Sequence, residues 1–100
     1  MTDKKPIRLT QTTLLILEVM LAGQPRSGAQ IGHATGIGSG SRYPILRRLE
    51  DAGWLTGEWE QVDPHQAGRP RCRFYCLTEF GEAQAQAALA RRSMARKQAA

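Results

Sequence analysis

Acidic residues are missing from long parts of this 100-residue chain. No aspartate or glutamate occurs between Glu18 and Glu50, between Asp63 and Glu79, or after Glu82, whereas arginines occur in all three intervals. With 14 lysines and arginines against 9 aspartates and glutamates, the formal net charge is +5. Positive charge concentrated in acid-free segments favours a polyanionic partner.

The chain is also poor in residues that bind metals or form covalent links. Cys72 and Cys76 are its only cysteines. On one predicted strand they would lie about 13 Å apart, too far for a disulfide, so packing residues in a reducing cytosol are the simpler interpretation. His33 and His65 do not have ligand spacing to these cysteines. We therefore expect neither a metal ion nor another cofactor.

Motifs for catalysis and for membrane insertion are missing as well. No carboxylate pair lies in an apolar setting, no nucleophile is accompanied by a base, and the glycines at 36, 38 and 40 do not follow a strand as a dinucleotide-binding loop would. The longest apolar run, residues 14–22, is interrupted by Glu18 and is too short to cross a bilayer. The N-terminus has no signal-peptide pattern. We expect a cytoplasmic protein that is not an enzyme.

The residues that are present predict three segments within a chain of single-domain size. Residues 1–9 are polar and basic and are expected to form a flexible arm. Residues 10–78 combine helix and strand patterns in the order of a winged helix-turn-helix. Residues 79–100 are rich in alanine and predict a last helix that serves dimerisation. The predicted fold is therefore mainly α with a β-hairpin wing.

Three helices are expected before the wing. Thr10 is suited to cap the first helix, and the Ser-Gly-Ala-Gln segment at residues 27–30 has the form of a capping box that begins the second. The third helix is predicted to begin near Gly40 or Ser41. The reason is Pro44, which is tolerated in a first turn because its missing N–H would have no helical acceptor there.

Two strands rich in aromatic and β-branched residues follow, at Trp54–Val62 and Arg71–Thr78. A polar loop joins them, and its Gly-Arg-Pro-Arg segment at residues 68–71 is expected to form a basic tip. Trp54 and Trp59 are expected to pack in the core and the hairpin rather than to form a ligand cage.

The third helix carries the most informative side chains. Ile45, Leu46 and Leu49 form its apolar stripe, which leaves arginines on and beside the opposite face. Such a helix suits a major groove, where arginine reads guanine, and a basic wing can reach phosphates or the minor groove. The alternative interpretation is that the third helix and the wing only expose their charged side chains to solvent. The expected DNA-binding residues are Ser39, Ser41, Arg42, Tyr43, Arg47, Arg48, Arg69 and Arg71, with Arg47 reading bases and Arg42 close enough to the buried stripe to pair with an acid instead.

The first and last helices predict a homodimer. Apolar residues surround most of the first helix, whereas a surface helix needs only one apolar stripe. The expected interface consists of Leu14, Leu17, Leu21, Ala83, Ala87, Ala90 and Met94. A two-fold dimer would present two basic helices ~34 Å apart, about one DNA turn, to an inverted-repeat operator.

Three segments together resemble the PadR family of bacterial transcriptional regulators. They are YPILRRLEDAGWL at residues 43–55, GRPR at 68–71 and FYCLTEFG at 74–81. The resemblance implies a dimeric winged helix-turn-helix repressor with its major-groove helix at residues 41–48, its wing at 68–71 and, in many members, an aromatic or drug-like effector. The short last helix resembles the compact branch of the family. It lacks the tryptophan that lines effector pockets in some members.

The leading hypothesis is a sequence-specific DNA-binding regulator, a repressor that associates with the nucleoid. A winged helix used as a protein-interaction or assembly module is one alternative, and it would present an apolar or acidic helix face in place of Arg47 and Arg48. An effector-gated small-molecule sensor is another, and it would need a roomy dimer cavity with aromatic walls.

Overall fold

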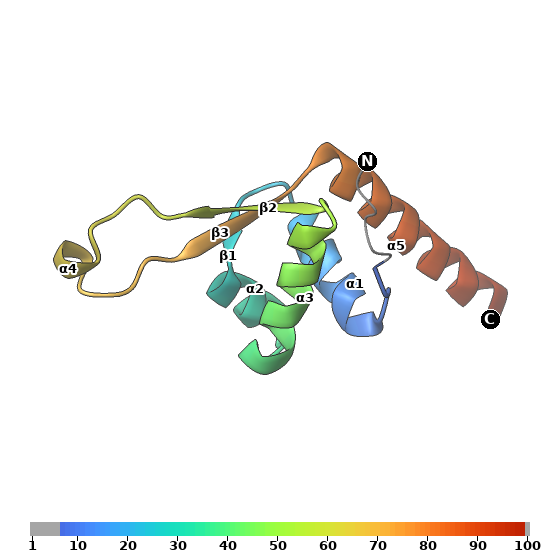
Figure 1. Ribbon diagram of the computed structural model, residues 1–100. Coiled ribbons are helices and arrows are strands. Elements are labelled where there is room, and N and C mark those ends of the chain that lie inside the picture. The colour runs from blue at the N-terminus through green and yellow to red at the C-terminus, as the bar shows by residue number, and fades with distance from the viewer. Residues whose placement is uncertain (1–6, 100) are drawn as a thin grey trace.

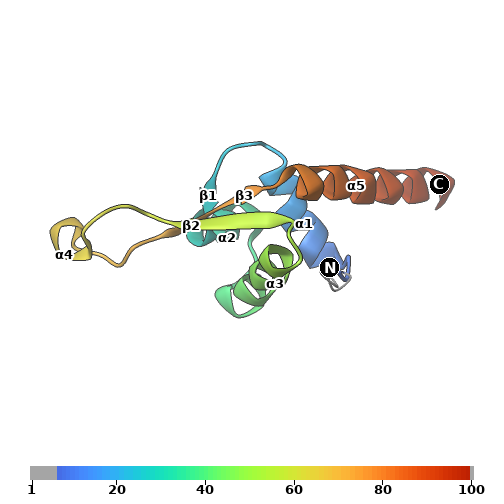
Figure 2. The ribbon, with the colours of Figure 1, turned by 45° about the horizontal axis from the view of Figure 1, so that its top comes forward.

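A computed structural model describes residues 7–99, with side chains to residue 94, so most of the predicted arm at residues 1–9 lies outside the described residues. The helices α1 to α3 form a central body (Figure 1). The β2–β3 hairpin extends from this body as a long wing that ends at α4, and α5 extends in the opposite direction (Figures 1 and 2). In chain order the elements are α1 Gln11–Met20, β1 Arg26–Ser27, α2 Gly28–Thr35, α3 Ser39–Asp51, β2 Leu55–Trp59, α4 Pro64–Ala67, β3 Arg73–Leu77 and α5 Glu79–Ala99.

The sheet has three antiparallel strands in the order β1-β3-β2. In the β2–β3 ladder, Leu55 is opposite Leu77 and Trp59 is opposite Arg73. Both strands are shorter than the sequence predicted, because the regular ladder stops at this last pair. The two-residue strand β1 was not predicted, since so short a segment has no alternating pattern.

The hydrophobic core lies between the three body helices, the near end of the sheet and the first turns of α5. The predicted stripe of α3 is confirmed, because Ile45, Leu46 and Leu49 are all buried. α5 contributes the small residues Ala85 and Ala88 and packs along α1. The largest fully buried side chains are Ile16, Leu17, Met20, Ile31, Leu46, Leu49 and Leu55.

Two of the predicted helix starts are confirmed by their capping contacts. The Thr10 hydroxyl accepts from the Thr13 N–H at 3.2 Å. At α2, the Ser27 hydroxyl accepts from the Gln30 N–H at 3.1 Å, and the Gln30 side chain accepts from the Ser27 N–H at 2.9 Å, which completes the capping box. These contacts satisfy N–H groups that have no partner within the helix.

The third helix begins earlier than the sequence predicted. Gly38 is its N-cap, so Pro44 is the sixth helical residue and lies inside the helix rather than in its first turn. A proline there removes the N–H that would bind the carbonyl of Gly40. Gly40 is exposed near the helix end, where water can replace that donor.

Candidate nucleic-acid interface

The outer face of α3 is basic and exposed. Arg47 and Arg48 both lie on this face, and Ser39 and Ser41 are exposed at its N-terminal end. The Arg47 Nε lies 3.8 Å from the Asp51 carboxylate, one turn further along, with 84% and 71% of the two side chains exposed. An ion pair so open to water contributes little, so the Arg47 side chain can leave it for a ligand.

Arg42 lies differently from the other arginines of α3. It is half-buried, and its Nη1 donates to the Ile37 carbonyl at 2.6 Å. The guanidinium lies over Gly32 of α2, where a Cβ atom would collide with it, and 4.9 Å from the centre of the Tyr43 ring. The expected alternative partner for Arg42 was an acid, and the partner is instead a backbone carbonyl. Arg42 ties α3 to α2 and to the turn between them.

Tyr43 lies against the first turn of α2. A Cβ atom at Gly28 would lie 2.6 Å from the Tyr43 ring, so the ring can occupy this position only because Gly28 has no side chain. The tyrosine hydroxyl is thereby held beside the N-terminus of α2, where N–H groups lack intrahelical acceptors and favour anions.

Arg69 is held within the wing by Glu60. Its Nη1 and Nη2 donate to the two Glu60 oxygens at 2.6 and 2.8 Å, and the Cys72 N–H donates to the same carboxylate at 3.2 Å. These contacts, the Arg69 hydrogen bonds first, lower the pKa of Glu60 to about 2, and the carboxylate raises the pKa of Arg69. This bidentate Arg69–Glu60 pair, called the clip below, joins the outgoing arm of the wing (residues 60–63) to the returning arm (residues 68–72).

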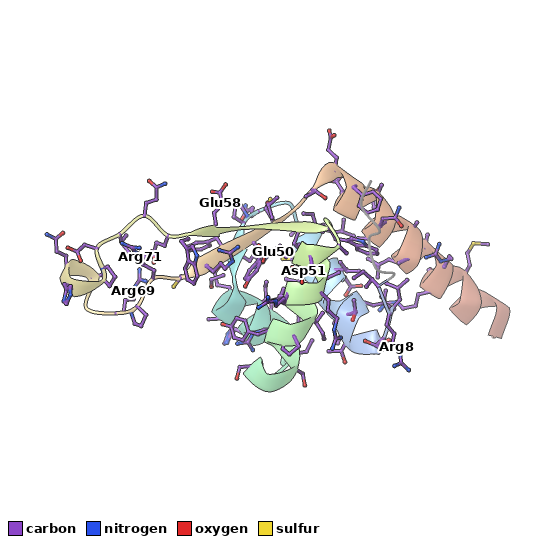
Figure 3. All side chains as sticks on the ribbon, viewed as in Figure 1. Arg8, Glu50, Asp51, Glu58, Arg69 and Arg71 are labelled. Carbon is purple, nitrogen blue, oxygen red and sulfur yellow. The ribbon has the colours of Figure 1, made fainter. Side chains whose placement is uncertain are left out.

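Arg71 remains exposed on the same arm, with its Nε donating to the Val62 carbonyl at 2.9 Å. The segment at residues 68–71 is not the tip of the wing, contrary to the prediction. The tip is the single turn α4, which Asp63 caps by accepting from the His65 N–H at 2.9 Å, and Arg69 and Arg71 lie on the returning arm (Figure 3). An aspartate before a proline is a helix-start signal that could have predicted this turn.

Three residues that the sequence analysis left out of the site connect α3 to the wing. The Arg73 Nη2 on β3 donates to the Glu50 carboxylate of α3 at 2.5 Å, and this pair raises the pKa of Arg73. The same guanidinium lies 5.2 Å from the centre of the Trp59 ring. Trp54 is buried as expected, but 59% of Trp59 is exposed, so it does not pack inside the hairpin.

A groove of about 540 Å³ lies between the N-terminus of α2, Tyr43 and the wing. Its wall combines three arginines with aromatic rings, and none of its lining residues is acidic. The lining consists of Ser27, Gly28, Ala29, Tyr43, Trp59, Arg69, Pro70, Arg71, Cys72, Arg73 and Tyr75. The groove is therefore suited to an anionic occupant with apolar portions.

The described residues contain no group of three or more histidine, cysteine and acidic side chains that could hold a metal ion. Cys72 and Cys76 are free thiols. Within residues 7–99, no helix is long and apolar enough to span a bilayer.

The structure has the fold of known bacterial regulators. AbfR of Staphylococcus epidermidis, solved in its reduced form bound to DNA, is 27% identical with a TM-score of 0.66, over 81% of this chain and 54% of that one. BpsR of Bordetella bronchiseptica is 16% identical with a TM-score of 0.74, over 91% and 61%. A PadR family regulator from Eggerthella lenta is 22% identical with a TM-score of 0.71, over 87% and 76%.

The chain thus spans about half the length of the solved AbfR chains. A comparison with curated proteins gave no match. The model of the PadR-like transcriptional regulator family matches residues 16–87, a range that includes the second half of α1, all elements from β1 to β3 and the start of α5. With its winged helix-turn-helix architecture and this match over most of its length, the chain belongs to the PadR-like family of transcriptional regulators.

Proposed function

We propose that this regulator binds double-stranded DNA as a homodimer and represses a promoter that contains an inverted-repeat operator. The observation that carries the proposal is the outer face of α3, where Arg47 and Arg48 are exposed while the opposite face is anchored in the core. A helix held in this way can enter a major groove without deforming the domain. Because that face is basic, it does not suit the assembly module that was the alternative.

Each polar residue of the interface has a proposed part. Arg47 reads a base, because its ion pair with Asp51 is exposed and weak and the side chain can leave it. Ser39, Ser41 and Tyr43 bind phosphates around the helix N-terminus, as hydroxyl groups commonly do. Arg48 and Arg71 supply further phosphate contacts, whereas Arg42 and Arg69 act through the geometry of α3 and of the wing. The structure of AbfR bound to DNA supports DNA as the ligand, and we place this activity in the cytoplasm, on the nucleoid.

The proposed dimer uses α5. Ala83, Ala87, Ala90 and Met94 are exposed along one stripe of this helix, which projects beyond the body (Figure 2). Small alanines permit close approach of two helices, and a two-fold axis there would relate the two copies of α3 by the symmetry that an inverted repeat has. On α1, Leu21 keeps part of its surface exposed, but Leu14 and Leu17 belong to the core of the protomer.

The test begins with selection of bound sites from a pool of random duplexes. We expect one enriched inverted repeat with half-sites about one helical turn apart. Arg47→Ala should then lose ~1–3 kcal/mol of binding free energy and relax selectivity at one base pair of each half-site. Arg91→Ala, which removes an exposed arginine of α5, is the matched control. Equal affinity and selectivity of the Arg47 variant and the wild type would refute the assignment of α3.

The assembly is tested separately with Met94→Glu. A charge in the middle of an apolar interface has no partner, so the variant should sediment as a monomer where the wild type is a dimer. It should also lose cooperative binding to the inverted repeat. Met94→Leu keeps the apolar contact and should behave as the wild type does. A wild-type protein that sediments as a monomer and still binds a single half-site with full affinity would overturn the dimer.

A further inference from the structure

We propose that Trp59 is a DNA-contacting residue, and that its indole ring packs on the deoxyribose of a strand that runs through the groove between α2, Tyr43 and the wing. This inference rests on the proposed function and deepens it, because it names both an additional contact residue and the part of the DNA that this residue meets.

The first argument is the side of the sheet on which Trp59 lies. Successive side chains of a strand point to opposite faces, so Leu55, Gly57 and Trp59 share one face of β2. Leu55 is buried beneath the body helices, whereas 59% of Trp59 is exposed. Glu58 points to the other face, away from the helices (Figure 3). Trp59 therefore lies on the core-facing side of the sheet, beyond the point at which the described helices cover it.

The second argument is the way in which the ring is held. The guanidinium of Arg73, opposite Trp59 in the ladder, lies 5.2 Å from the ring centre and is fixed by Glu50 of α3 at 2.5 Å. A Cβ atom at Gly57 would lie 2.7 Å from the Arg73 Nε, so the absence of a side chain there leaves room for this arrangement. The exposed ring is therefore oriented by α3 before any ligand binds. Binding then costs little additional conformational entropy.

The third argument identifies the occupant. The groove is lined by Arg69, Arg71 and Arg73, and its lining contains no carboxylate. At its inner end it meets the first turn of α2 and Tyr43. A DNA strand alternates anionic phosphates with apolar sugar faces, which matches guanidinium groups placed around an aromatic ring. Arg69 and Arg73 are already paired with Glu60 and Glu50, whereas Arg71 contacts a backbone carbonyl and keeps its positive charge available for a phosphate.

The two tryptophans of the chain make the contact directly measurable. Trp54 is 8% exposed and Trp59 is 59% exposed, so acrylamide quenching of tryptophan fluorescence reports mainly Trp59. Addition of the selected operator duplex to the full chain should lower the quenching to the level of Trp59→Phe, which retains only Trp54. The same duplex should leave quenching of Trp59→Phe unchanged. This control also corrects for absorption by the DNA.

Affinity gives the second readout. Trp59→Ala should raise the dissociation constant about tenfold, as loss of an aromatic stacking partner does in strand-binding proteins. The loss should be equal for the operator and for an unrelated duplex, because a sugar carries no sequence information. Thr56→Ala, on the opposite face of β2, is the matched control and should not change the constant. Thermal unfolding of both variants should follow the wild type, since neither side chain is buried.

The outcomes separate this inference from the proposed function. If the wild type binds the operator but Trp59 stays equally accessible to acrylamide, the inference is wrong and the proposed function stands. If heparin protects Trp59 as well as duplex DNA does, the groove is a general anion site and the inference is again wrong. If the wild type binds no duplex, the proposed function fails, and this inference fails with it.

Discussion

The arginines of α3 and those of the wing differ in what they contact. On α3, Arg47 and Arg48 point into solvent, with a single weak ion pair between them and the rest of the described chain. In the wing, Arg69, Arg71 and Arg73 each have a short contact with a carboxylate or a carbonyl of the same chain. Arginine is therefore an exposed, potential ligand contact at positions 47 and 48 of α3, whereas Arg69 and Arg73 of the wing act as structural ties, as Arg42 does within α3.

The physical reason is that the two regions bury different amounts of apolar surface. α3 is fixed by its backbone hydrogen bonds, by three buried apolar side chains and by the contact of Arg42 with the Ile37 carbonyl, so Arg47 and Arg48 are not needed to hold it. Beyond the Trp59–Arg73 pair the wing has no apolar core, and an isolated hairpin is only marginally stable in water. Charged side-chain contacts then define its shape. A count of arginines consequently overestimates the potential ligand contacts in both regions, by Arg69 and Arg73 in the wing and by Arg42 in α3.

The largest expected effect concerns the body. Leu46→Ala should lower the free energy of unfolding by about 2–5 kcal/mol, because it leaves a cavity in the core beneath α3. Urea unfolding followed by circular dichroism measures the change. In the wing, Gln66→Ala at the exposed α4 turn should alter stability by less than ~0.5 kcal/mol. Comparable losses in the two variants would mean that the wing is part of the cooperative core.

A smaller effect should distinguish the two arginines of the returning arm. Arg71→Ala should lower the slope of log binding constant against log salt by about one, the value for one phosphate contact. Arg69→Ala should leave that slope nearly unchanged, because Glu60 already neutralises Arg69.

Glu60→Gln tests the same difference between Arg69 and Arg71, because it weakens the Arg69–Glu60 pair and makes the Arg69 guanidinium available to a phosphate. Its salt slope should rise by up to about one and its affinity for any duplex should increase. Glu58→Gln removes an exposed carboxylate on the other side of the sheet and serves as the control for net charge. An equal decrease of the slope in Arg69→Ala and Arg71→Ala would show that both side chains contact phosphates.

The smallest effect is the pH dependence of the clip. The pKa of Glu60 is lowered to about 2 from an ordinary value of 4.5. The carboxylate therefore stabilises the folded wing fully above pH 4.5, and this contribution is lost as the pH falls towards 2. An NMR titration of the Glu60 carboxyl should give the low midpoint, and Arg69→Ala should move it back towards 4.5. A wild-type midpoint near 4.5 would mean that the clip is open in solution.

Local signals predicted most of the helices and the core of the fold. Thr10 and the capping box at residues 27–30 act within one turn, so their function is visible in the sequence. The spacing of the apolar residues of α3 likewise identified its buried face. The family resemblance that was noted in the sequence is confirmed by the match over residues 16–87.

The features that the sequence did not predict depend on contacts between distant residues. Strand β1 exists only because Arg26 and Ser27 pair with Tyr75 and Phe74. The exposure of Trp59 depends on where the helices stop covering the sheet. The pairing of Arg69 with Glu60 depends on the hairpin register, which no local pattern fixes. Tertiary contacts therefore decide which arginines are paired within the chain and which are exposed.

Two glycines of α2 bear on which substitutions can change the ligand preference of such regulators. Gly28 and Gly32 lie one helical turn apart and receive the side chains of Tyr43 and Arg42, two neighbours in α3. A methyl group at Gly28 would collide with the Tyr43 ring, whereas one at Gly32 would displace the Arg42 guanidinium from its place against α2. Under the proposed function, a new operator preference would arise most directly from a substitution at the outward position 47, which leaves these packing contacts unchanged. Substitutions at Gly28 and Gly32 would instead act on the packing between α2 and α3.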